Sequence, residues 1–557
     1  MKTTVAVAVL AAMVGFAGAG TTIYVDVNNT TGVEDGSAAH PYNTIQEGID
    51  AAANGDEVIV APGTYPENVT FVGSGITADF TLRSTDPTDP DVVAATVIDG
   101  GAAGRVVTLD GAETGSVELL GLTITNGWAV TGAGIKGSGT HAAITRCVVT
   151  GNSYASDAVD IHGVGMHNCD GPITHCIISD NSGSIDDDHK YVQGVGLYDC
   201  DGSITACTVS GNWGGGPRGT GRGGGLAYCD GAITDCSIVG NSIEITECGY
   251  DYTHGGGLYD CDGVISGCIV ADNTAAFLGP CFTMHHGGGL AYCDCVVNCL
   301  VTGNSAAGAE GAELSGAEGG GLYGCDYVQN CTVVGNSAWG ETFSCGGGLS
   351  SCHIVVNCVV WGNTADTGPQ VYYVSTTPSY SCIQDWTGGG TGNTADDPLF
   401  VPGLCGDYYL SQIAAGQGDD SPCLDAGSDT AANLGLDEYT TRTDILADSG
   451  QVDMGYHYPY SQLHTSPLGQ YWNLIGSQRP APTPLTDYGL TDMRDLKTWK
   501  EAVAAGWVQS MLYYYGAGVG YMECRTDGTG DDDSVRPEYG YWLLTYQPGL
   551  SLIIPAP

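Results

Sequence analysis

The sequence predicts an all-β protein whose middle is a parallel solenoid, and three regularities predict it. A glycine-rich triplet recurs eight times from Gly132 to Gly346, at intervals of 27 to 32 residues. An Asn follows each triplet after 17 to 20 residues, and between them a Cys lies two residues before an aliphatic side chain. A period of two is that of a β-strand, and a repeat of about 30 residues without helical spacing is typical of one solenoid coil.

The composition indicates a folded, turn-rich chain. The 557 residues include 88 Gly, and 63 acidic against 15 basic residues give a net charge of −48. Nucleic acids and anionic membranes are bound by basic surfaces, so this charge argues against both as partners. With 42% hydrophobic residues, the chain is too apolar for a disordered acidic segment.

The first 19 residues have the pattern of a secretory signal peptide. Lys2 precedes an apolar run from Val5 to Phe16, and a small-residue cleavage site ends at Ala19. The run is too short to span a bilayer, and no later segment has the 18 apolar residues of a membrane helix. We therefore expect cleavage after Ala19 and export of the protein.

The segment before the repeats fits the entrance of a solenoid. Ile45, Ile49 and Ala52 are spaced to share one face of a short helix before Gly55, which would cover the open edge of the first coil. Within each repeat, all substantial length variation lies between the Asn and the next triplet, at one corner of the coil. We expect the Asn to take a left-handed turn conformation there, with its amides stacked from coil to coil.

Two segments resemble a known family. The repeat at 255–273, with its Gly-Gly-Gly-Leu-Tyr-Asp-Cys-Asp-Gly start and its Asp-Asn end, resembles those of secreted right-handed parallel β-helix proteins and of polymorphic outer-membrane proteins. The segment at 41–46, Pro-Tyr-Asn-Thr-Ile-Gln, followed by Gly55-Asp56-Glu57-Val58, resembles the entry of pectin-lyase-like β-helices. The resemblance implies a single-stranded right-handed parallel β-helix. That fold hosts lyases, hydrolases and non-catalytic adhesins, so it assigns no activity.

The end of the chain divides into a closing segment and a module. Residues 397–400, 421–427 and 452–456 resemble the closing segments of such β-helices, so the β-helix domain is expected over residues 20–460. Residues 468–557 hold four of the nine Trp and a helical pattern from about Asp492 to Ala505. They predict a small C-terminal α+β or β-sandwich module.

The 23 Cys allow several interpretations. A Cys at an inward position of each coil behaves as a small buried hydrophobe, and in-register neighbours about 4.8 Å apart are slightly too distant for a disulfide. Packed thiols are the main expectation, while pairing within a coil and metal binding stay open. Cys248 with Cys281, in adjacent variable corners, and Cys405 with Cys423 are the better disulfide candidates.

The variable corner carries the side chains that suggest a function. Stacked on one edge, its loops would form a wall of carboxylates and aromatic rings, as in many sugar-binding surfaces; solvated loops with packed aromatics are the alternative. The candidates for ligand contact are Asp186, Asp187, Asp188, His189, Tyr191, Trp213, Tyr252, His254, His285 and His286.

The basic residues allow a catalytic alternative. Between residues 150 and 430 they are Lys190, Arg218 and Arg222 alone, in consecutive variable corners. The resemblance to uronate-cleaving β-helix lyases implies one of them as base, with Ca²⁺ held by Asp186, Asp187 and Asp188. A hydrolase with two loop carboxylates also stays open. The sequence thus predicts a bacterial protein, secreted or at the cell surface, that binds polysaccharide or acts in adhesion through the variable corner. A Ca²⁺-dependent polysaccharide lyase or a glycoside hydrolase is the alternative.

Overall fold

The computed structural model describes most of the chain. It covers residues 20–459, apart from gaps at 73, 75, 77–78, 110–116, 157–158, 248–251, 280–282, 309–314 and 404, and the strands, the helix and Val508 within residues 464–554. The expected signal peptide and the disulfide candidates Cys248 and Cys281 lie outside these residues.

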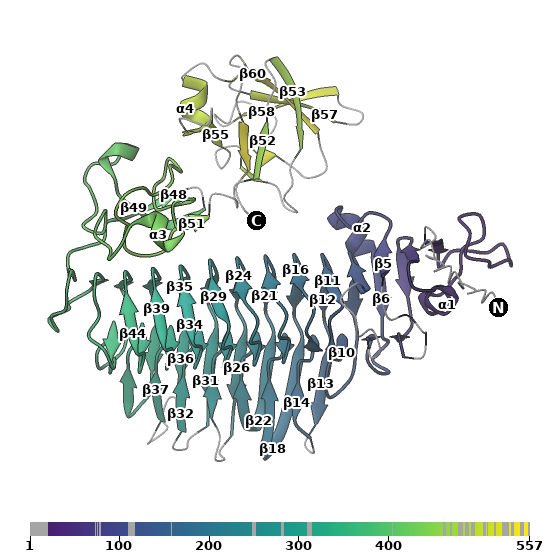
Figure 1. Cartoon of the computed structure of the whole chain (residues 1–557), viewed down its shortest axis with the longest axis horizontal. Coiled ribbons are helices and arrows are strands. Elements are labelled where there is room, and N and C mark those ends of the chain that lie inside the picture. Colours follow the sequence, from purple (N-terminus) through teal and green to yellow (C-terminus); the bar gives the residue numbers. More distant parts are fainter. Residues whose placement is uncertain are drawn as a thin grey trace, which may run out of the picture.

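Parallel strands from successive coils form four long sheets that run along one axis (Figure 1). In one representative coil the chain passes through β19 (Leu197–Tyr198), β20 (Ile204–Thr205), β21 (Thr208–Ser210) and β22 (Trp213–Arg222). The sheets through β20 and β21 each have 12 strands; they begin with β1 (Thr22–Val25) and β3 (Gly63–Tyr65) and end with β44 (Ile354–Val356) and β47 (Cys382–Ile383). The predicted right-handed parallel β-helix is confirmed.

The sheet through β19 has 11 strands. Its strands are β4 (Val69–Thr70), β7 (Val107–Thr108), β10 (Ile135–Thr140), β15 (Met166–Cys169), β19, β23 (Leu226–Ala227), β28 (Leu258–Tyr259), β33 (Leu290–Ala291), β38 (Leu322–Tyr323), β43 (Leu349–Ser350) and β46 (Val371–Tyr372). We call it the tyrosine-bearing sheet.

The variable corner forms a fourth sheet, which we call the fin because its strands extend from one side of the solenoid (Figure 1). Strands β18 (Ser182–Gln193) and β22 run out and back within one element. In other coils the outgoing strands are β13 (Ser153–Ser156), β26 (Ser242–Ile245), β31 (Thr274–Phe277), β36 (Ser305–Ala307) and β41 (Ser337–Trp339), and the returning strands are β14 (Ile161–His162), β27 (Thr253–His254), β32 (Thr283–His286), β37 (Ser315–Glu318) and β42 (Phe343–Cys345).

The fin corrects the expectation of a wall of loops. Side chains such as Ile161, Ile185 and Ile243 are buried in one cluster within it, and Ala306 and Ala317 in another. Alternate residues of both layers therefore face inward, as in any two-sided β-packing. Only the other alternate residues and the far turns remain available to a ligand.

Each coil turns at four residues with positive φ. In the representative coil these corners are Gly194, Asp199, Ala206 and Gly211, and Gly216 and Gly219 have positive φ at the far turn of the fin. Gly211 precedes the recurrent Asn212, so the expectation that the Asn itself is left-handed is wrong. The preceding residue absorbs the turn, most often as Gly because its positive φ costs nothing there. This leaves the Asn side chain free to point into the solenoid.

The buried asparagines form an amide ladder. Asn212 Nδ2 donates to Asn241 Oδ1 at 2.9 Å, and Asn241 Nδ2 donates to Asn273 Oδ1 at 3.0 Å. The same bond joins neighbouring coils from Asn152 to Asn363, and Gln370 accepts the last one at 2.8 Å. The predicted stacking of amides is confirmed.

The cysteines of the described residues are free thiols. Those of the two repeated columns are buried in the solenoid core, and backbone N–H groups donate to the sulfur one coil on, as from Cys207 to Cys236 at 3.4 Å. The candidate pair Cys405 and Cys423 is not bonded. Cys423 packs with Cys382 and Met454, whereas Cys405 packs against a separate cluster that contains Tyr409. The closing segment folds so that each sulfur faces a different side of it.

We expect most of these thiols to be unreactive in the native protein. Of the 20 cysteines whose side chains the structure describes, Cys295 and Cys405 are partly exposed and the rest are buried. Burial raises the pKa of a thiol such as Cys268 well above its usual range, and only the thiolate reacts. Mass spectrometry after alkylation at neutral pH should find little label on the buried columns until guanidinium is added. Label on Cys268 in the native protein would contradict the packing described.

Short helices and a closing segment complete the domain. Helix α1 (Ile45–Ala51) buries Ile45 and Ile49, which confirms the predicted helix at the entrance, and α2 (Pro90–Ala95) follows two coils later. The closing segment holds β48 (Phe400–Gly403), β49 (Gly406–Leu410), a 3₁₀ turn (Ile413–Ala415), α3 (Ala431–Leu434), β50 (Tyr439–Thr440) and β51 (Tyr458–Pro459). No helix of the described residues is long and apolar enough to cross a bilayer.

The closing segment docks on corner asparagines of three late coils. Asn298 Nδ2 donates to the His457 carbonyl at 3.0 Å, and its Oδ1 accepts the His457 N–H at 2.7 Å. Asn357 Oδ1 accepts the N–H of Ser428 at 2.8 Å. Earlier coils carry Ala206 or Asp235 at this corner, so the asparagines mark where the segment docks.

The C-terminal strands pair antiparallel. The pairs lie in three sheets: β52 (His464–Pro467), β61 (Ser551–Ile554), β55 (Gly489–Thr491) and β56 (Leu496–Thr498); β53 (Tyr471–Gly476), β60 (Gly540–Thr545), β57 (Met511–Gly516) and β58 (Gly520–Arg525); and β54 (Thr483–Pro484) with β59 (Ser534–Val535). Helix α4 (Trp499–Ala504) is shorter than expected because residues 496–498 form β56. Trp499, Leu512 and Leu543 are buried.

Candidate functional site

A row of tyrosines runs along the solenoid where the fin meets the tyrosine-bearing sheet. Tyr198, Tyr259 and Tyr323 end strands of that sheet, and Tyr228 and Tyr292 occupy the next corner with positive φ. Opposite them lies the last residue of each returning strand, in register from coil to coil: His162, Gln193, Arg222, His254, His286, Glu318 and Cys345. We call the five tyrosines with Arg222, His254 and His286 the tyrosine strip.

The glycine triplet brings the two columns together. The first Gly of each triplet has positive φ, as Gly255 does, and turns the chain from the returning strand into the tyrosine-bearing sheet. His254 and Tyr259 flank this turn, and their rings lie 5.8 Å apart. Because a Cβ on Gly256 would lie 2.4 Å from the Gly288 carbonyl, the coils stack this closely only with glycine there.

The rings of the strip form one continuous series. Centroids of successive tyrosines from Tyr198 to Tyr323 are 5.4, 5.5, 5.8 and 5.3 Å apart, each pair edge to face. His162 stacks on Tyr198 at 4.5 Å at one end, and His286 stacks on Tyr323 at 4.0 Å at the other. Tyr292 remains 37% exposed, so the row presents ring surface to solvent.

Arg222 lies in the middle of the strip. Its guanidinium carbon is 5.1 Å from the ring centre of Tyr191 and 5.2 Å from that of Tyr259. Its Nη1 donates to the Tyr228 hydroxyl at 3.3 Å. Two cation–π contacts and one hydrogen bond therefore hold the charge in a fixed orientation.

Burial keeps the imidazole and phenol groups of the strip uncharged. It lowers the pKa of His286 to about 4 and that of His254 well below its ordinary value, where the neighbouring His286 and Arg222 add to the effect. It raises the pKa of Tyr198 to about 12, and it raises the pKa of Glu318. At pH 7 the imidazoles and phenols are therefore uncharged, and Arg222 is the cation of the strip.

The structure divides the residues singled out from the sequence. Arg222, His254 and His286 lie in the strip, with Tyr191 against Arg222 and Tyr252 against His254 at 5.9 Å. His285 does not belong there. It is buried in the fin, where its Nδ1 lies 2.8 Å from the Thr253 hydroxyl. Trp213 starts the outgoing part of β22, on the other layer of the fin.

The three basic residues do not converge. Arg218 lies at the far turn of the fin and pairs with Glu247 at 3.6 Å. Lys190 lies at the far turn of β18, where Asp187 accepts the His189 N–H at 2.8 Å. Four residues of strand separate Arg218 from Arg222, which is about 13 Å. Only Arg222 therefore reaches the strip.

The candidate Ca²⁺ ligands are also placed at that far turn. Asp186 is exposed, and the side chain of Asp188 lies outside the described part of the structure. Within the described residues, no three His, Cys, Asp or Glu side chains group closely enough to hold a metal. Nothing in this arrangement supports the expected site.

Sequence reasoning missed most of the strip. Its five tyrosines were not among the candidates, because they lie in the fixed part of the repeat and not in the variable corner. The sequence nevertheless shows where these tyrosines recur. Tyr198, Tyr259 and Tyr323 come directly after the Leu that follows a glycine triplet, and Tyr228 and Tyr292 come one residue later, after an Ala. A residue type that recurs in the fixed part of the repeat lies at the same position of successive coils and so forms a row along the solenoid. Residues of the variable corner need not align in this way.

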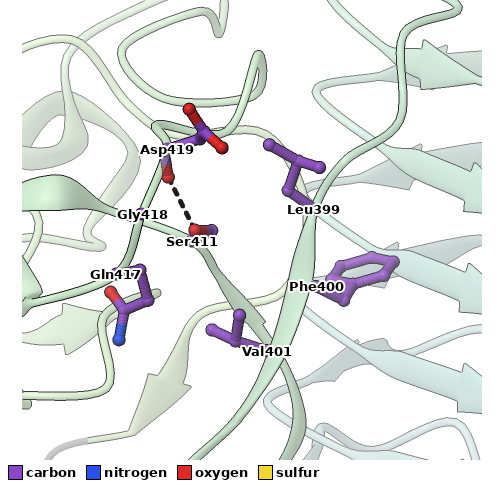
Figure 2. A pocket seen from close by; sticks show the side chains of 7 residues that line it. All are labelled: Leu399, Phe400, Val401, Ser411, Gln417, Gly418 and Asp419. Carbon is purple, nitrogen blue, oxygen red and sulfur yellow. Dashed lines mark hydrogen bonds between the residues drawn. The ribbon is translucent and has the colours of Figure 1, made fainter.

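A separate pocket of about 300 Å³ lies in the closing segment (Figure 2). Its lining residues are Leu399, Phe400, Val401, Ser411, Gln417, Gly418 and Asp419. The Ser411 hydroxyl donates to the Asp419 carbonyl at 2.6 Å, and Gln417 Nε2 donates to Thr443 Oγ1 at 2.7 Å. Asp419 is the one titratable side chain of this lining, so the pocket offers no acid–base pair.

No protein-family model matches the chain, and no curated protein is significantly similar to it in sequence. Comparison with solved structures gives weak similarities, of which three are described. Pectate lyase Pel9A has 12% identity and a TM-score of 0.34 over 78% of this chain and 95% of that one. XylC, solved with xylose, has 11% identity and a TM-score of 0.28 over 68% and 87%. The enzymatically active domain of bacteriophage CBA120 tailspike protein 4 has 11% identity and a TM-score of 0.17, over 95% of this chain and 67% of that one. Likeness at this level assigns no activity.

Proposed function

We propose that the protein binds an extended polysaccharide along the tyrosine strip. The continuity of the strip carries this proposal: five tyrosines follow one another at 5.3 to 5.8 Å, and Tyr292, which is 37% exposed, presents ring surface and a hydroxyl group to solvent, whereas Tyr259 is 8% exposed. Sugar rings combine apolar faces with polar edges, which is what tyrosine side chains match. With the expected export, the ligand would be an extracellular or cell-surface glycan and the role attachment.

Charge favours a glycan over the other polymers that stack on aromatic side chains. Single-stranded nucleic acids also bind aromatic platforms, but they need a basic groove for their phosphates. The strip has one fixed cation in a chain of net charge −48. A polymer with one negative charge per unit is therefore disfavoured unless its charge meets Arg222.

Replacing Tyr292 with alanine should weaken this binding. Tyr292 is the most exposed tyrosine of the strip that contacts two others, so its loss interrupts the row and removes contact area. We expect about a 10-fold higher Kd, as for a central aromatic contact, by affinity electrophoresis against a panel of neutral and acidic polysaccharides.

Trp339→Ala is the matched control for that experiment. Trp339 is 44% exposed on the outgoing layer of the fin, away from the strip. Equal effects of the two substitutions, or no binding to any polymer of the panel, would refute the proposed surface.

Eliminative cleavage at the same place is the second candidate. Arg222 is the one expected lyase base that lies in the strip, and the Tyr228 hydroxyl beside it at 3.3 Å is a possible proton donor to the leaving group. Incubation with uronic-acid polymers, with and without Ca²⁺, should then yield unsaturated products that Arg222→Lys abolishes. Binding without such products leaves attachment as the function.

A further inference from the structure

Within the part of the chain that the structure describes, Arg222 makes no ion pair, although the chain has about four acidic residues for every basic one. Arg83, Arg218 and Arg442 pair with Glu57, Glu247 and Asp444. No carboxylate of the described residues lies within pairing distance of Arg222, and its Nε is buried without an acceptor. An unmatched hydrogen-bond donor of this kind costs about 1–3 kcal/mol and calls for an explanation.

The carboxylates around the strip are held elsewhere. Asp260, on the corner after Tyr259, interacts electrostatically with Arg222 but forms no ion pair with it. Glu318 accepts a hydrogen bond from Ser350 at 3.0 Å and lies three coils away, which is about 14 Å. The other described groups beside Arg222 are phenols, the neutral imidazole of His254 and the amide of Gln193. Among the residues that the structure describes, no carboxylate therefore forms an ion pair with the guanidinium.

The aromatic contacts orient this charge and leave it partly accessible. Tyr191 and Tyr259 contact the guanidinium, and Arg222 is only partly buried. Since Nη1 donates to the Tyr228 oxygen, the hydroxyl proton of Tyr228 remains available to a second acceptor. Arg222 and Tyr228 together present donors to an oxyanion.

We propose that Arg222 and Tyr228 form a subsite for an acidic group, a carboxylate or a sulfate ester, carried by the polysaccharide that the strip binds. This inference rests on the proposed function and specifies its ligand. A planar guanidinium matches both oxyanions and binds them through charge-assisted hydrogen bonds. The neighbouring tyrosines contact the sugar rings on either side, so acidic groups on other units face neutral side chains.

The net negative charge of the protein does not prevent this contact. Repulsion between an acidic polymer and distant carboxylates is screened beyond about 8 Å at 0.15 M salt. The contact with Arg222 is short-ranged and partly shielded from solvent. Binding is therefore best measured at physiological ionic strength, where the local contact outweighs the long-range field.

The test uses one polymer backbone in three forms: hydroxyethyl cellulose, carboxymethyl cellulose and cellulose sulfate. We expect the native full-length protein to bind at least one acidic form about 10-fold or more tightly than the neutral form. Arg222→Gln should remove that preference, so that this variant binds the three forms with affinities within about two-fold of one another. The difference in affinity between carboxymethyl cellulose and cellulose sulfate shows whether the subsite prefers a carboxylate or a sulfate ester.

Matched variants make the outcomes distinguishable. Arg218→Gln removes the same charge from the far turn and should leave the preference intact, whereas Arg222→Lys should retain only part of it. Equal binding of all three polymers, with Tyr292→Ala still weakening it, would overturn the acidic subsite and keep the strip as the binding surface. The subsite would also be overturned if the protein bound none of the three cellulose polymers, or if Arg218→Gln reduced the preference for the acidic form as much as Arg222→Gln does. If the protein bound no polysaccharide of the panel used for Tyr292→Ala either, the proposed function would be overturned as well.

Discussion

Asn241→Asp is expected to destabilise the solenoid by about 3–5 kcal/mol at pH 7. The Asn241 side chain is completely buried, and its Nδ2 donates to the Val209 carbonyl at 2.9 Å and to Asn273 Oδ1 at 3.0 Å. A carboxylate has nearly the same shape but no donor, so both contacts become oxygen–oxygen repulsions around a buried charge. Urea denaturation gives the free energy of unfolding.

The destabilisation should shrink at low pH. A buried carboxyl group has a raised pKa, so the folded variant binds a proton that the unfolded chain releases, and its stability falls as pH rises. At pH 4 the protonated variant regains one donor and part of the lost stability. Asn126→Asp is the control: at this exposed corner it replaces the hydrogen bond to Asp99 Oδ1 with a solvent-screened contact between two carboxylates and should cost only about 1 kcal/mol. If both variants unfold alike, the amide ladder does not carry the stability assigned to it.

The fold was predictable because the same sequence pattern recurs in eight coils. Period-two spacing of Cys and aliphatic residues in each coil identifies inward positions without any knowledge of the neighbours. The conformation of Asn212 was not predictable in the same way. Asn tolerates left-handed φ, but Gly211 just before it tolerates it better, and only the burial of the amide decides between them.

The binding surface was only half predictable. Arg222, His254 and His286 stood out as rare side chains in the variable corner, and they do lie in the strip. Their partners come from the fixed part of the repeat, across the glycine turn, and that adjacency needs the coil geometry. Lys190 and Arg218 look equivalent to Arg222 in sequence. What distinguishes the three residues is how many residues lie between each of them and the next glycine triplet, because that number sets the distance of the side chain from the base of the fin.

A buried carboxyl group in the closing segment should make stability depend on pH in an unusual direction. Asp453 is 5% exposed; its Oδ1 accepts the Asp425 N–H at 2.7 Å and its Oδ2 accepts the Thr441 hydroxyl at 2.5 Å. Burial, and the nearby charge of Asp448, raise the pKa of Asp453 to about 6, while the Thr441 hydroxyl and His457 oppose this. Asp448 also faces His457 Nε2 at 2.9 Å, so the cluster sits where the segment docks on Asn298.

The raised pKa fixes the sign of the effect. Between its ordinary value of 3.8 and about 6, the folded state holds a proton on Asp453 that the unfolded chain has lost. The stabilisation is complete below pH 3.8 and is lost as pH rises through 6; the difference corresponds to about 3 kcal/mol. Asp453→Asn has no charge to titrate: its Oδ1 can still accept the Asp425 N–H, and its Nδ2 would donate to the Thr441 hydroxyl oxygen in place of accepting from it. Its stability relative to the native protein should therefore rise by about that amount from pH 3.5 to pH 7.

A second substitution tests the cause. Thr441→Val removes the hydroxyl that favours the ionised form, so it should raise the pKa of Asp453 further and steepen the loss of stability between pH 4 and 7. Urea denaturation at a series of pH values gives both curves. Parallel curves for the native protein and Asp453→Asn would show that this carboxyl group is not the one that titrates.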